Sequence, residues 1–112
     1  MDFVNKVEAL RLEIRYPRHL AQLLSVQFDE HSVRVRAPAT SGLRWNQRFA
    51  WCDVASACYV HGEPGSGNIL FVDLRDRGEP ARVPMHAPGA EDFYSQLISR
   101  GIFPFVARRA RG

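Results

Sequence analysis

Alternating apolar and polar residues dominate most of the chain, and this period of two is typical of half-buried β-strands. Residues 10–16 alternate apolar with charged side chains and predict the first strand. Residues 26–28 and 33–35 flank the polar stretch 29–32, which predicts a β-hairpin. Residues 17–25 fit one helical turn as well as the start of a strand, so the pattern leaves their structure open.

Strand patterns continue as far as residue 85. Residues 45–51 place two tryptophans, a glutamine and a phenylalanine on one face, and residues 54–61 form the next apolar-rich segment. Residues 69–74 are nearly all apolar and are followed by a polar turn and residues 81–85, so these two segments predict a second hairpin. The pattern therefore predicts about seven strands.

The apolar period changes to three or four residues between Gly89 and Gly101, which predicts a helix. The two glycines suit the ends of this helix, and Phe93, Leu97 and Ile98 form an apolar stripe along one side of it. A helix of this length is stable in water only when its apolar stripe is covered. We therefore expect the helix to pack against the strands.

A chain of 112 residues with 46% hydrophobic residues is long enough for one buried core. We expect a single domain over residues 1–106, followed by a basic tail over residues 107–112. No stretch reaches the roughly 20 apolar residues of a membrane span, and the first residues lack the features of a signal peptide. We therefore expect a cytoplasmic protein whose two cysteines are reduced.

Three segments before the predicted helix resemble those of small bacterial pleckstrin-homology-like (PH-like) domains. They are Phe49–Val54, Ile69–Leu74 and Arg82–Pro84. The resemblance implies a mainly β (α+β) fold, a PH-like barrel in which about seven antiparallel strands form two orthogonal sheets and one C-terminal helix caps the barrel. It also implies a binding scaffold, because PH-like domains mostly bind phosphoinositide headgroups, peptides or proteins and are seldom catalytic.

Arginine supplies all but one of the 15 basic residues, and the formal net charge is +3. Strand alternation places Arg11 and Arg82 on outward faces. It does the same for the four residues that form the candidate anion- or partner-binding site, which are Arg15, Arg34, Arg36 and Arg48. Neighbouring strands can align such residues into a patch for phosphate or carboxylate groups. A solvated sheet face balanced by nearby acidic residues explains the same pattern and stays open as an alternative.

Patterns for catalysis and metal binding are weak. The four histidines are dispersed along the chain, and Cys58 with His61 supplies too few ligands for a closed zinc site. The same two side chains point to opposite faces of a strand, so they do not form a nucleophile pair. We expect no enzyme activity, no metal and no cofactor. Nucleic acid is disfavoured as a partner, because Trp45, Phe49 and Trp51 fall on the apolar face of their strand.

These patterns favour an interaction module that recognises a protein segment, or self-associates into a homo-oligomer, through an exposed sheet edge or loop end. The alternative is a peripheral binder of anions or of an anionic membrane surface. This second function would use the arginine-rich sheet face together with the basic tail.

Overall fold

The computed structural model of the 112-residue chain describes residue 3 and residues 5–7, 23–37, 45–62, 67–75 and 77–107. This part of the chain is mainly β, with a helix near its C-terminal end, which confirms the predicted α+β class. The predicted strand at residues 10–16 lies outside the described residues. The same is true of Arg15 and of residues 108–112 in the predicted tail.

The described residues contain seven strands, and a helix follows the sixth. In chain order the elements are β1 (Ser25–Phe28), β2 (Ser32–Arg36), β3 (Gln47–Ala50), the 3-10 helix η3 (Trp51–Asp53), β4 (Val54–Val60), β5 (Ile69–Leu74), β6 (Ala81–Pro84), α2 (Ala90–Ser99) and β7 (Phe105–Ala107). Phe3 and residues 5–7 are also helical, a feature that the sequence pattern did not predict.

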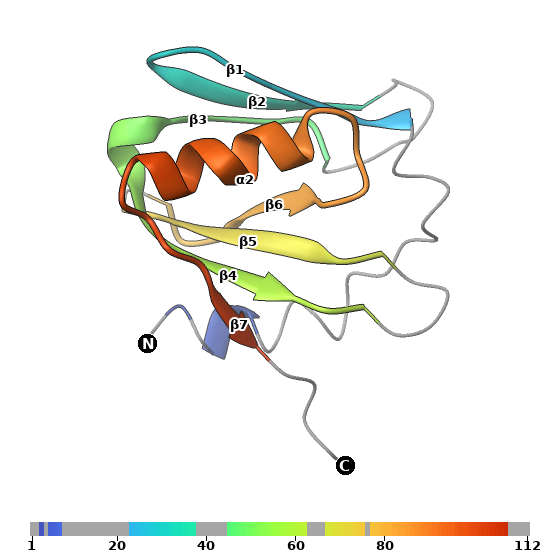
Figure 1. Ribbon diagram of the computed structural model, residues 1–112. Coiled ribbons are helices and arrows are strands. Elements are labelled where there is room, and N and C mark those ends of the chain that lie inside the picture. The colour runs from blue at the N-terminus through green and yellow to red at the C-terminus, as the bar shows by residue number, and fades with distance from the viewer. Residues whose placement is uncertain are drawn as a thin grey trace.

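The strands form a three-stranded sheet in the order β1-β2-β3 and a four-stranded sheet in the order β6-β5-β4-β7. Both predicted hairpins are confirmed, because β1 pairs with β2 and β5 pairs with β6, each antiparallel. In Figure 1 the seven strands follow one another from β1 at the top to β7 at the bottom, with β3 next to β6. The strands of the two sheets therefore follow one another in a single order, and the two sheets meet where β3 lies beside β6.

Two details of the predicted barrel differ from the structure. The barrel is not closed among the described residues, because β1 and β7 stand at opposite ends of the strand series. The expectation that all strands are antiparallel is also wrong, because β7 runs parallel to β4. The reason is the direction of α2, which runs opposite to β4 (Figure 1) before the chain reverses at Gly101, a left-handed residue with a φ of 82°. The next strand must then run in the direction of β4.

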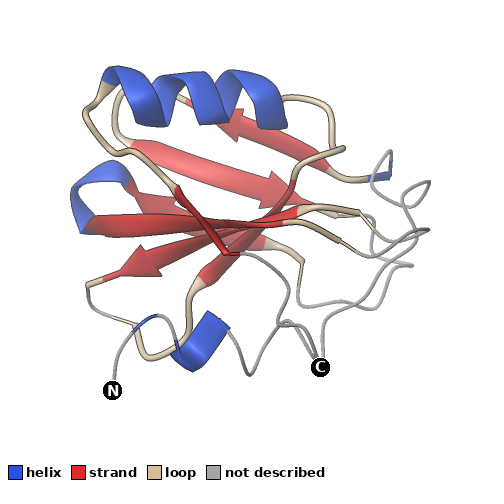
Figure 2. Cartoon of the chain, turned by 60° about the horizontal axis from the view of Figure 1, so that its bottom comes forward, coloured by secondary structure: helices blue, strands red, loops and turns tan. Residues whose placement is uncertain are grey.

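The apolar stripe of α2 packs into the core, as the sequence predicts. Ala90, Phe93 and Leu97 are each 0% exposed. The ring of Phe93 lies 6.2 Å from that of Phe49 and 5.5 Å from that of Trp51. Complete burial of a phenylalanine side chain stabilises a fold by about 1.5–3 kcal/mol. Figure 2 shows α2 along one side of the strands and the N-terminal helical residues on the other side.

The turn between β1 and β2 is held by polar contacts. One carboxylate oxygen of Asp29 accepts hydrogen bonds from the backbone N–H groups of His31 and Ser32, both at 2.8 Å. The indole N–H of Trp51 donates to the Asp29 carbonyl oxygen at 2.8 Å. The guanidinium of Arg100, just after α2, lies 4.2 Å from the centre of the Trp51 ring. These contacts fix the hairpin against the C-terminal end of the helix.

Gly89 allows the start of α2 to lie close to the backbone of β1. It has a φ of 88°, in the left-handed region that favours glycine. A Cβ atom at this position would lie 2.0 Å from the carbonyl oxygen of Val26 in β1. The backbone N–H of Val26 also donates to the Pro88 carbonyl oxygen at 2.8 Å. The start of the helix is therefore in direct backbone contact with the first sheet.

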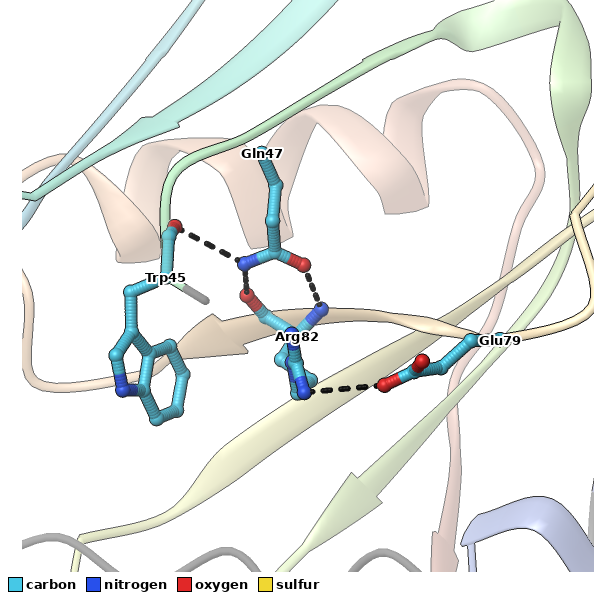
Figure 3. A network of polar contacts seen from close by, with 4 residues as sticks. All are labelled: Trp45, Gln47, Glu79 and Arg82. Carbon is cyan, nitrogen blue, oxygen red and sulfur yellow. Dashed lines mark hydrogen bonds and ion pairs between the residues drawn. The ribbon is translucent and has the colours of Figure 1, made fainter. Parts of the chain in front are cut away.

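The side chain of Gln47 joins the two sheets (Figure 3). Its amide nitrogen donates to the Arg82 carbonyl oxygen, and its amide oxygen accepts from the Arg82 backbone N–H, both at 2.7 Å. The same nitrogen also donates to the Trp45 carbonyl oxygen at 3.2 Å. The carboxamide thus makes the pair of hydrogen bonds that a backbone peptide group would make in a ladder between β3 and β6.

We predict that Gln47→Glu destabilises the protein by about 1–3 kcal/mol at neutral pH, because a carboxylate cannot donate to the carbonyl oxygens of Trp45 and Arg82. Gln96→Glu is the matched control, since Gln96 is half-buried like Gln47 but lies on α2, away from the junction. Urea denaturation of both variants measures the difference. A loss for Gln47→Glu no larger than that for Gln96→Glu would show that this junction is unimportant.

We also predict that Gly89→Ala lowers the free energy of unfolding by about 2–5 kcal/mol, because it adds both a strained φ and a clash with the backbone of β1. Gly78→Ala is the control, since a Cβ at Gly78 meets no atom within 4 Å. Thermal denaturation followed by circular dichroism should show a large drop in Tm for Gly89→Ala only. Equal Tm values would contradict the backbone contact.

The carboxyl group of Asp29 should have a pKa below its ordinary value of 3.8, because the His31 and Ser32 backbone N–H groups stabilise its charged form. A lowered pKa means that this group stabilises the folded state above pH 3.8, and that the contribution is lost as the pH falls through the lowered value. An NMR titration of the Asp29 carboxyl carbon measures this pKa. A value at or above 3.8 would contradict the hydrogen-bonded turn.

Candidate functional site

Three of the four arginines predicted as a binding site lie together on the first sheet. Arg34 and Arg36 are alternate residues of β2, and Arg48 is the register partner of Arg34 on β3. All three side chains are exposed. We call Arg34, Arg36 and Arg48 the arginine face. The fourth residue, Arg15, lies outside the described residues.

Buried and exposed side chains alternate along β2 and β3, and this alternation explains why the arginines point outward. Val33 and Val35 are each 0% exposed, and Phe49 is 2% exposed. These apolar side chains turn toward α2, where Phe49 contacts the ring of Phe93. The residues between them must therefore lie on the face turned away from the helix. The sequence predicted this direction, but only the register places Arg34 opposite Arg48.

Positive charge on the arginine face is not balanced within the described part of the chain. No acidic residue there forms an ion pair with Arg34, Arg36 or Arg48; the pair between Arg82 and Glu79 lies elsewhere. A fourth arginine, Arg77, lies close by, because its guanidinium donates a hydrogen bond to the Arg48 carbonyl oxygen. The arrangement is electrostatically unfavourable, since like charges directly opposite each other on neighbouring strands destabilise a sheet.

Arg82 does not belong to this surface, contrary to the sequence prediction of an outward position. It is only 8% exposed. Its guanidinium lies 5.7 Å from the centre of the Trp45 ring and forms an ion pair with Glu79 at 3.2 Å. Alternation correctly placed Arg82 on the face of β6 that is opposite α2. That face is covered by Trp45, a residue from before β3, so it does not meet solvent.

A second exposed surface lies around β7, at the end of the four-stranded sheet. Phe103, Phe105 and Val106 are 71%, 43% and 53% exposed, and we call these three residues the β7 surface. The ring of Phe105 contacts that of Phe3 edge to face, with centroids 6.0 Å apart. The alternation of these residues is too short to predict a strand, and pairing with β4 creates it.

The residues considered for catalysis or metal binding do not come together. Cys58 is 1% exposed and lies inside the core. His61 is exposed, and its ring lies 5.0 Å from that of Tyr59. Among the described residues, no three histidine, cysteine, aspartate or glutamate side chains gather where they could hold a metal ion. In the same part of the chain, no helix has the length and apolar character needed to cross a membrane.

Comparison with known proteins adds no assignment to these two surfaces. No protein-family model, curated protein or solved structure matches the chain.

Proposed function

We propose that this protein is a small PH-like interaction module without catalytic activity, which associates with a protein partner through the sheet edge at β7. The β7 surface carries the proposal, because its three side chains are large, apolar and exposed. The PH-like fold is supported by the order of the elements, with two sheets followed by a helix that packs between them. In such a scaffold, exposed edges and loop ends are the places available for partners.

The edge position of β7 makes strand addition the natural mode of binding. One side of β7 pairs with β4, and the other side pairs with no strand among the described residues. Edge strands are commonly protected from unwanted pairing by charged side chains. Residues 101–107 contain no charged residue. This edge therefore lacks charged protection, which leaves it open to a partner strand.

A second copy of the chain is a suitable partner, because its own β7 presents the same apolar edge. In an antiparallel pair of β7 strands, the apolar side chains of one copy meet those of the other across a two-fold axis.

We predict that the wild-type protein forms dimers in a concentration-dependent manner, and that Val106→Lys shifts it to monomer because a lysine on an edge strand opposes pairing. Leu23→Ser is the matched control, because Leu23 is 58% exposed and lies before β1, away from β7. Analytical ultracentrifugation over a range of concentrations measures the state of each variant, with circular dichroism to check folding. A wild-type protein that stays monomeric, or a control that also abolishes the dimer, would contradict self-association through β7.

A further inference from the structure

The arginine face is suited to bind a partner that supplies negative charge. Arg34 and Arg48 lie directly opposite each other, and Arg36 follows on the same face of β2. Their guanidinium groups have no acidic partner among the described residues. An arrangement of this kind opposes the stability of the sheet, and an anion placed between the guanidinium groups removes the repulsion.

The spacing of the three arginines follows from the strand geometry. Register partners on antiparallel strands have Cα atoms about 4.5–5.5 Å apart. Alternate residues of one strand, such as Arg34 and Arg36, are about 7 Å apart along it. An extended peptide has the same two-residue repeat. Carboxylates at alternate positions of such a peptide therefore match the repeat of β2, and Arg48 adds a guanidinium from across the ladder.

We propose that the arginine face binds an extended acidic segment of a partner protein, in which aspartate or glutamate occupies alternate positions. Two successive carboxylates pair with Arg34 and Arg36, and Arg48 contributes to the first of these pairs. The planar guanidinium suits this role because it binds a carboxylate through two parallel hydrogen bonds. Arg77, which is held at the Arg48 carbonyl oxygen, adds further positive potential at this end of the site.

The remaining side chains of this face favour a peptide over a membrane. Proteins that lie on a membrane surface combine basic residues with apolar side chains that enter the lipid. The outward neighbours of the arginines on the same three strands are Ser25, Gln27, Ser32 and Ala50, which are polar or small. The exposed Phe105 lies on β7 in the other sheet. Phe28 on β1 is 37% exposed, but it is the register partner of the buried Val33 and so lies on the face opposite the arginines. The same lack of exposed aromatic rings on this face argues against single-stranded nucleic acid.

Fluorescence anisotropy with a labelled peptide that alternates four glutamates with serines tests this proposal. We expect the double variant Arg34→Gln/Arg48→Gln to bind this peptide about tenfold more weakly or worse, because charge-assisted hydrogen bonds are lost. Arg75→Gln is the matched control, since Arg75 is exposed but follows β5 on the other sheet. It should retain wild-type affinity. A peptide with glutamine in place of glutamate should not bind, and one with four contiguous glutamates should bind more weakly.

Stability measurements separate the site from the fold. Because the double variant removes like charges that face each other, its Tm should equal or exceed that of the wild type. Equal peptide affinity of the double variant and Arg75→Gln would overturn the proposal, as would equal binding of the alternating and contiguous peptides. Tighter, arginine-dependent binding to vesicles of phosphatidylserine than to the peptide would also overturn it in favour of a membrane. The site is separate from β7, so these outcomes leave the proposed self-association untouched.

Discussion

The architecture depends on a side-chain amide that takes the place of a backbone ladder. Within the described part of the chain the two sheets share no strand pairing, and Gln47 connects them through two hydrogen bonds to the backbone of Arg82. A carboxamide can do this because it carries one donor group and one acceptor in the same geometry as a peptide group. The connection holds β3 beside β6, and this in turn brings both sheets against the apolar stripe of α2.

Burial on the side opposite α2 decides which arginines are available for binding. On β6, Trp45 covers Arg82, whose charge is paired with Glu79. On β2 and β3 the corresponding face stays exposed, so Arg34 and Arg48 keep their contact with solvent. The same strand alternation therefore produces a structural arginine in one sheet and a candidate binding surface in the other.

The two candidate surfaces lie at different places along the strand series, with α2 packed between the sheets (Figure 1). The arginine face belongs to β2 and β3, and the β7 surface belongs to the last strand of the other sheet. The helix contributes its apolar stripe to the core and supplies no residue to either surface. Association through β7 would leave the arginine face open in each copy, so the two proposed interactions are compatible in one molecule.

The sequence by itself determined the elements whose signals are local. Strand alternation predicted both hairpins and the outward direction of Arg34, Arg36 and Arg48, and the apolar stripe of the helix predicted its burial. Only the tertiary structure decided the parallel pairing of β7, the burial of Arg82 beneath Trp45 and the junction at Gln47. These features depend on contacts between residues far apart in the chain, such as the 35 positions between Gln47 and Arg82. A local pattern shows which face of a strand is polar, but the covering of that face depends on where other segments pack.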